Sequence, residues 1–381
     1  MRLLHTRTYQ LETFLGTDIP PYAILSHTWG QDEFVFEDLK VPIADQLDNP
    51  KRGLRKVLQS CALAIKDGLD YVWVDTCCID KSSSAELSEA INSMFAWYRD
   101  SSNCYVWLED VTLGEGAQGR LGDFDASNWF RRGWTLQELI APHGVAFYDS
   151  KWNLIDDRYS LAGRISKLTH IKQEILQRRH KGCEEEKNVL LRIFNEDPRC
   201  SSCGGKDNLR FYLWKTPTAA RMGWASRRRT CRAEDEAYSL LGLFDVNMPL
   251  LYGEGRDKAF RRLIHEMLQH NQADSSILLW QTSPLDSYTN LCLPMDLGPR
   301  YFEGGVSSLH LNSMWPKPDL VVNPRGLEVS VWLAPSSAIS AAKGAYGSQQ
   351  IIVSWLFSRR AQGATDPRPW AFSSCLCTRC P

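Results

Sequence analysis

Apolar and polar positions follow two different periods in the first 111 residues. Two segments, 54–65 and 87–98, repeat apolar residues every three to four positions, as amphipathic helices do. Gly68 follows the first as its predicted C-cap, and Ser83 and Glu86 precede the second with the spacing of a capping box. Apolar runs rich in β-branched and aromatic residues surround these helices and predict strands over 21–30, 70–78 and 103–111.

The predicted order is strand, helix, strand, helix, strand. Units of this kind form parallel sheets with right-handed crossovers and helices on the faces. The strands are apolar almost throughout, which is typical of strands buried on both faces. We therefore predict an α/β fold with a parallel sheet flanked by helices. The pattern continues with a helix over 130–140, a strand over 145–152 and a helix over 160–169.

Composition divides the rest of the chain. A charge cluster and a CSSCGG run interrupt the pattern after residue 177, helical periodicity returns at 210, and Pro, Gly and Ser become frequent after 281. The predicted organisation is an α/β domain over 1–177 with its core at 22–142, a variable insertion or linker over 178–209, a helical segment over 210–280, an irregular β-containing region over 281–366 and a disordered tail over 367–381.

Net charge and hydropathy argue against nucleic-acid and membrane partners. The 381 residues carry a net charge of −1, which gives no reason to expect a nucleic-acid or anionic-membrane partner. The first residues lack the apolar core of a signal peptide, and no apolar run reaches the length of a membrane span. We therefore expect a cytoplasmic protein, in which the twelve cysteines are mostly reduced thiols.

Polar residues lie at the carboxyl ends of the first two predicted strands. Ser26, His27 and Trp29 end the first, and Asp75 ends the second. Because ligands of open α/β sheets bind beyond the carboxyl ends of the strands, these residues are candidates for a binding site. Each can equally be a loop cap that satisfies nearby backbone groups. Ser26 and His27 are adjacent and point to opposite faces of a strand, so we do not expect a dyad between them.

Three other patterns have simpler interpretations than the chemistry they suggest. GEGAQG at 114–119 matches a dinucleotide fingerprint, but no helix opens after it, so a surface turn is favoured. The Cys-x-x-Cys pairs at 200–203 and 377–380 are too far apart for a compact zinc site, and no metal is expected. His27 with the Cys77-Cys78 pair can form a thiol nucleophile, but a buried, inert cysteine is the commoner outcome.

The segment FRRGWTLQELIAP predicts a short helix that its proline stops. Phe130, Trp134 and Glu138 are spaced at i, i+4 and i+8, so they are expected on one helix face. A solvated glutamate would normally lie on the opposite face. Two interpretations stay open: a structural ion pair with Arg131, Arg132 or another base, and a working carboxyl in an aromatic pocket, where desolvation raises the pKa.

Several long blocks resemble the signature blocks of the fungal HET (heterokaryon incompatibility) domain. They are PYAILSHTWG, YVWVDTCCIDKSSSAELSEAINSMFAWYRDS and RGWTLQELIAP. The start, MRLLHTRTYQLETF, resembles the usual lead-in, and residues 221–255 resemble the block that often follows the domain. The resemblance covers roughly residues 1–280 and is specific, because the blocks occur in the right order. The resemblance implies that 1–177 is a HET domain and that 210–280 is a HET-associated helical segment.

HET-domain proteins act in self/non-self recognition that leads to programmed cell death, and the domain is similar to TIR domains. The resemblance therefore implies a TIR-like or flavodoxin-like parallel sheet. SNWFRRGWTLQEL resembles the TIR segment whose glutamate is catalytic in NAD-cleaving members, and that glutamate corresponds to Glu138. The implied site has Glu138, Ser26 and Asp75 as catalytic residues and, around the dinucleotide, His27, Trp29, Asp80 and Trp134.

The resemblance leaves two functions open. The first is a cell-death effector that hydrolyses NAD to nicotinamide and ADP-ribose, with NAD as a substrate and no permanently bound cofactor. The second is a non-catalytic TIR-like module that passes a signal by assembly. In either case the expected partners are further copies of this chain and an incompatibility partner protein.

Overall fold

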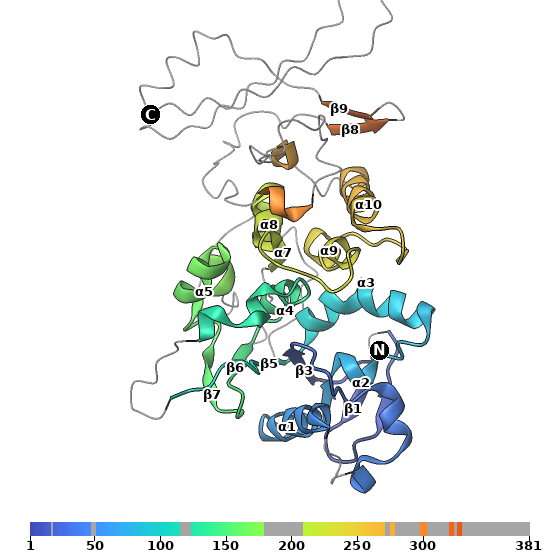
Figure 1. Ribbon diagram of the computed structural model, residues 1–381, viewed down its shortest axis with the longest axis vertical. Helices are drawn as coiled ribbons and strands as arrows, with labels where there is room; N and C mark the ends of the chain where they lie inside the picture. Colours follow the sequence, from blue (N-terminus) through green and yellow to red (C-terminus); the bar gives the residue numbers. More distant parts are fainter. Residues whose placement is uncertain are drawn as a thin grey trace, which may run out of the picture.

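A seven-stranded mixed sheet forms the centre of the first part of the chain (Figure 1). The computed structural model describes residues 1–16, 18–46, 51–114, 123–178, 209–270, 275–278, 298–302, 320–323 and 326–329. The strand order is β2-β1-β4-β3-β5-β6-β7. The strands are β1 (Arg2–His5), β2 (Leu11–Thr13), β3 (Tyr22–His27), β4 (Tyr71–Trp73), β5 (Asn103–Trp107), β6 (Val145–Tyr148) and β7 (Leu154–Asp157).

The predicted parallel sheet is confirmed only for the four central strands. β4, β3, β5 and β6 run parallel, whereas β1 and β2 at one edge and β7 at the other pair antiparallel. The sheet is therefore mixed, and its edge strands were not predicted. All six residues of β3 are buried, as its apolar sequence indicates, and this strand lies between β4 and β5.

The two amphipathic helices form where the periodicity predicts them. They are α1 (Arg52–Lys66) and α3 (Ser84–Asp100). Gly68 has a φ of 75°, the left-handed conformation of a residue that ends a helix. At the start of α3 the Ser83 hydroxyl accepts the Glu86 amide at 3.3 Å, but the Glu86 carboxylate accepts the Asp80 amide instead of the Ser83 amide. Only half of the predicted capping box therefore forms.

The strands predicted over 21–30, 103–111 and 145–152 are shorter in the structure, and two other predicted elements are interrupted. β4 ends at Trp73, and Asp75 begins the short helix α2 (Asp75–Cys78), so the predicted strand over 70–78 was wrong in its second half. The predicted helix over 130–140 is also divided. Its first residues form the 3₁₀ turn η4 (Asn128–Arg131), and α4 spans only Thr135–Ile140. Phe130, Trp134 and Glu138 therefore do not share one face of a continuous helix.

A tertiary contact at Gly133 explains the break before α4. The Gly133 amide donates to the Arg229 carbonyl at 2.8 Å, and the Arg229 amide donates to the Arg131 carbonyl at 2.6 Å. A Cβ on Gly133 would lie 2.5 Å from a methyl group of Thr230, so the close approach requires glycine. Backbone groups that a helix would use internally are bonded to the later segment instead.

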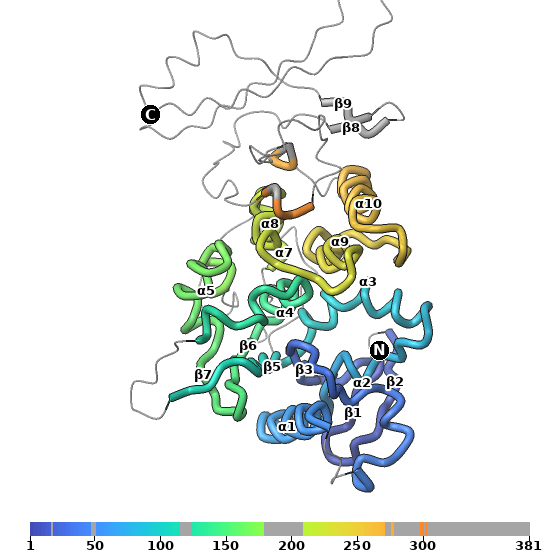
Figure 2. Tube along the Cα trace, in the orientation of Figure 1, coloured from blue at the N-terminus to red at the C-terminus, as the bar shows by residue number. Residues whose placement is uncertain are grey.

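The helices of residues 209–270 pack against α3 and α4 on the side away from the sheet (Figures 1 and 2). Gly242 lies so close to Phe95 of α3 that an added Cβ would be 2.0 Å from the phenylalanine Cβ. Within the predicted helical segment over 210–280, residues 235–244 form two short pieces and not one helix. The helices described after β7 are α5 (Ala162–Thr169), α6 (Gln173–Leu176), α7 (Leu209–Lys215), α8 (Thr218–Ala225), α9 (Asp235–Tyr238) and α10 (Arg256–Gln269), with a 3₁₀ turn at Gly242–Phe244.

Several predictions lie outside the described residues. These are most of the glycine run at 114–119, both Cys-x-x-Cys pairs, most of the insertion and the tail. Of the region over 281–366, the structure describes the 3₁₀ turn Pro299–Phe302 and the hairpin of β8 (Leu320–Asn323) and β9 (Gly326–Val329). No helix among the described residues combines the length and the apolar character needed to cross a membrane.

Candidate functional site

Ser26 and Glu138 meet in the interior although 112 residues separate them in sequence. The Ser26 hydroxyl, near the carboxyl end of β3, donates to Glu138 Oε2 at 2.5 Å. The indole nitrogen of Trp129 donates to the same hydroxyl at 2.8 Å. Ser26 and Trp129 are fully buried, and Glu138 is 6% exposed. A serine hydroxyl therefore connects a buried indole to a buried carboxyl group.

The Glu138 carboxyl is held close to its titration point at neutral pH. Burial raises its pKa to about 7, and the charge of Asp75 adds to the rise. The Ser26 hydrogen bond and the charges of Arg132 and Arg228 act in the opposite direction. Among the described residues, none forms an ion pair with Glu138, so the predicted pair with Arg131 or Arg132 does not form. A carboxyl with this pKa can hold or release a proton under physiological conditions.

A second polar group lies at the start of α2. Asp75 accepts a hydrogen bond from the indole nitrogen of Trp29 at 2.8 Å, and His27 Nε2 lies 3.6 Å from Asp75 Oδ1. The Lys81 ammonium is 3.6 Å from the centre of the Trp29 ring, an arrangement that stabilises a cation over an aromatic face. The structure thus brings Asp75, His27 and Trp29 together beside the buried pair.

At neutral pH, Asp75 is charged and His27 is not. Burial lowers the pKa of His27 to about 4, more than the nearby Asp75 can raise it, so the imidazole is neutral at pH 7. Burial alone would raise the pKa of Asp75, but the charges of Lys81, His27 and Arg132 and the Trp29 hydrogen bond lower it below its ordinary value. Asp75 is therefore a fixed negative charge at neutral pH.

The remaining predicted residues lie elsewhere or are inaccessible. Asp80 accepts bonds from the Ser82 amide and hydroxyl in the turn before α3. Trp134 donates to Asp235 at 3.2 Å and so contacts the later helices. Cys77 is fully buried, and its hydrogen bond with Cys78, together with burial, raises its pKa well above the ordinary value. This environment disfavours the thiol nucleophile.

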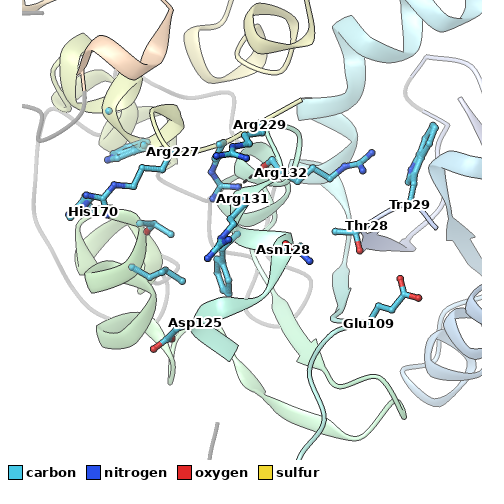
Figure 3. A pocket seen from close by; sticks show the side chains of 16 residues that line it. Thr28, Trp29, Glu109, Asp125, Asn128, Arg131, Arg132, His170, Arg227 and Arg229 are labelled. Atoms are coloured by element: carbon cyan, nitrogen blue, oxygen red, sulfur yellow. Dashed lines mark hydrogen bonds between the residues drawn. The ribbon is translucent and has the colours of Figure 1, made fainter. Parts of the chain in front are cut away.

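A cavity of about 680 Å³ opens beside these groups (Figure 3). Thr28 and Trp29, directly after β3, line one end of it, whereas Ser26, His27, Asp75 and Glu138 do not line it. Its other lining residues are Glu109, Asp125, Asn128, Phe130, Arg131, Arg132, Leu168, Thr169, His170, Gly223, Trp224, Arg227, Arg228 and Arg229.

The sequence pattern predicts Arg131 and Arg132 only as possible partners of Glu138 and assigns no role to Arg227, Arg228 or Arg229. The available signals were the adjacent pair at 131–132 and the run of three at 227–229, which look like solvated charges when taken alone. Sequence reasoning also missed Trp129 as the partner of Ser26. Among the described residues, no three His, Cys, Asp or Glu side chains are grouped closely enough to hold a metal ion.

Comparison with known proteins finds a protein family that matches part of this chain. Residues 22–123 match the Heterokaryon incompatibility protein (HET) family. The HET resemblance that the sequence blocks predict is therefore confirmed over this range, which contains Ser26, His27 and Asp75 but ends before Glu138.

The chain is also similar to a fungal protein. It is 43% identical over 251 residues to Vegetative incompatibility protein HET-E-1 of Podospora anserina. The similarity covers 64% of this chain and 16% of that protein, so the chain corresponds to a small part of its relative's length. No solved structure matches the chain.

Proposed function

We propose that this chain is an effector of fungal vegetative incompatibility, the self/non-self response that ends in programmed cell death. The match of residues 22–123 to the HET family and the 43% identity to a vegetative incompatibility protein support this proposal. The similarity extends beyond the family match, which argues for a shared role of the α/β sheet and the helices packed on it.

We further propose that the effector acts by TIR-like hydrolysis of NAD. The observation that carries this proposal is the Glu138 carboxyl, buried against the Ser26 hydroxyl and raised in pKa to about 7. A carboxylate that already accepts one hydroxyl at 2.5 Å offers the chemistry needed to accept a hydroxyl of the nicotinamide ribose. Active-site carboxyl groups are characteristically shifted toward neutral pH by burial.

The reaction follows from the charges involved. The bond between the ribose C1′ and the nicotinamide nitrogen breaks, and its electron pair neutralises the pyridinium ring. The ribose develops oxocarbenium character, which a nearby fixed carboxylate stabilises. Water then forms the new C1′–O bond and releases one proton, giving nicotinamide and ADP-ribose. Ionised Glu138 would stabilise the positive charge, while Asp75 adds a second negative charge near it.

A second function is favoured by a different observation. Glu138 is only 6% exposed and does not line the cavity, so in this conformation it is shielded from a ligand. A non-catalytic module that signals by self-association would keep the Ser26–Glu138–Trp129 group as an internal polar connection. Catalysis, by contrast, requires the cavity to open toward Glu138.

Expression in a fungal cell separates the two functions. Glu138→Gln keeps the size of the side chain and one oxygen that can accept a hydrogen bond, but removes its charge. A catalytic effector should lower viability and cellular NAD, and the variant, expressed at the same level, should do neither. Toxicity that the variant retains, with cellular NAD unchanged in both strains, would instead support the assembly module.

A further inference from the structure

Arginines from two distant parts of the chain form one wall of the cavity. Arg131 and Arg132 come from the turn before α4, and Arg227, Arg228 and Arg229 follow α8. Figure 3 shows Arg131, Arg132 and Arg229 close together from these two segments, with Arg227 nearer His170. Five guanidinium groups around about 680 Å³ are a concentrated positive charge in a chain whose net charge is −1.

The two acidic residues of the lining do not balance this charge. Glu109 forms an ion pair with Arg52 at 2.7 Å, and Asp125 forms one with Arg164 at 2.6 Å. Neither Arg52 nor Arg164 lines the cavity, so each carboxylate is already paired with a cation outside it. Among the described residues, these two carboxylates therefore do not neutralise the guanidinium groups of Arg131 and Arg229.

Backbone hydrogen bonds fix the two arginine segments side by side. Arg132 and Arg229 form a parallel β-bridge, made by the bonds that join Arg229 to Arg131 and to Gly133. The arginines are thus held near one another by the fold, although like charges repel. A bound anion would offset the repulsion between these guanidinium groups.

Arg228 is a buried member of this group of arginines, held by hydrogen bonds to the protein. Its side chain is 9% exposed, and Nη1 donates to the Arg132 carbonyl at 2.9 Å and to the Thr135 hydroxyl at 2.8 Å. Nη2 is buried and has no hydrogen-bond partner among the described residues. Leaving a buried guanidinium nitrogen unpaired is unfavourable, and a ligand oxygen would satisfy it.

Arg131 and Arg229 have a different role. Both are exposed, and neither guanidinium contacts a carboxylate or carbonyl oxygen among the residues that the structure describes. They are therefore available to a ligand without breaking an existing bond within that part of the chain. Planar guanidinium groups bind phosphate oxygens with two parallel hydrogen bonds, which makes arginine the preferred residue for phosphate recognition.

We propose that this cavity binds the diphosphate of a nucleotide ligand, with Arg131 and Arg229 contacting the phosphate oxygens and Arg228 supporting them from the buried side. The volume is within the range of small-molecule sites, about 300–1,000 Å³. That the ligand is a dinucleotide rests on the proposed function; the diphosphate site itself does not. All five arginines lie outside the HET match at 22–123, and three of them come from the segment that follows α8.

Binding measurements on the full chain test the site without any turnover. The protein carries Glu138→Gln, and the probes are inorganic pyrophosphate, ADP-ribose and nicotinamide riboside, which has no phosphate. We expect the first two to bind and the third to bind much more weakly. Arg131→Ala and Arg229→Ala should each weaken pyrophosphate and ADP-ribose binding about tenfold or more.

The control is Arg55→Ala, an exposed arginine on α1 that does not line the cavity and should leave both affinities unchanged. Affinities that the Arg131 and Arg229 variants retain, or that Arg55→Ala lowers equally, would overturn the proposal. So would a short single-stranded oligonucleotide that binds more tightly than ADP-ribose at physiological salt. Failure of the protein to hydrolyse NAD would refute the proposed function yet leave pyrophosphate binding, so the two failures are distinguishable.

Discussion

The charge on Glu138 should make the protein less stable as the pH rises. In the unfolded chain the carboxyl titrates near its ordinary pKa of 4.5, whereas burial raises the folded value to about 7. Between these two values the folded protein keeps a proton that the unfolded chain has lost. The free energy of unfolding therefore falls across this window and stays low above pH 7.

Glu138→Gln removes this titration while retaining an oxygen that can accept the Ser26 hydroxyl. One pKa unit corresponds to about 1.4 kcal/mol, so the difference between the two values of Glu138 corresponds to about 3 kcal/mol. Most of it, about 2–3 kcal/mol, falls between pH 5 and pH 8. The stability of the variant relative to the parent should therefore increase by about 2–3 kcal/mol from pH 5 to pH 8.

Urea unfolding followed by tryptophan fluorescence measures this difference, since the chain has 14 tryptophans. Glu89→Gln, on the exposed side of α3, makes the same chemical change away from this site and is the matched control. A loss of about 3–5 kcal/mol at pH 8 on changing Glu138 would instead indicate a buried ion pair and refute this reasoning. A difference that does not change with pH would show that the folded carboxyl titrates normally.

Three further outcomes follow from individual contacts. Ser26→Ala leaves a buried indole N–H without its acceptor and should cost about 1–3 kcal/mol in thermal unfolding; an unchanged melting temperature would mean that the bond contributes little. Gly242→Ala forces a methyl group against Phe95 and should lower the free energy of unfolding by about 1–3 kcal/mol. A variant as stable as the parent would show that the helices after residue 208 are loosely packed on α3. In the native protein, peptide mapping after iodoacetamide treatment should find exposed Cys231 alkylated and buried Cys77 protected; rapid labelling of Cys77 would revive the thiol nucleophile.

Periodicity alone predicted the parts of the fold that local sequence determines. α1 and α3 carry strong helical patterns, and the strands at the centre of the sheet are continuous apolar runs. The edge strands β1, β2 and β7 have only three or four residues, so their sequence shows no clear alternation. They gain their structure from pairing with neighbours that are distant in sequence.

The residues of the candidate site were also predicted only in part. Ser26 and Asp75 were predicted as site residues because they lie at the carboxyl ends of apolar strands, and Glu138 because its segment resembles the TIR segment. The length of that helix was wrong because a tertiary contact at Gly133 replaces its first turn. The arginine wall could not be predicted, since it exists only where the backbone at Arg229 pairs with the turn before α4.

Nicotinamide release from NAD by the purified full chain tests the central claim most directly. It should be measured at high protein concentration, at pH 8, where Glu138 is ionised, with Glu138→Gln as the matched variant. The account predicts nicotinamide and ADP-ribose from the parent and none from the variant, with both proteins folded. Equal release by both, or no release by a folded and self-associated parent, would contradict a catalytic role for Glu138.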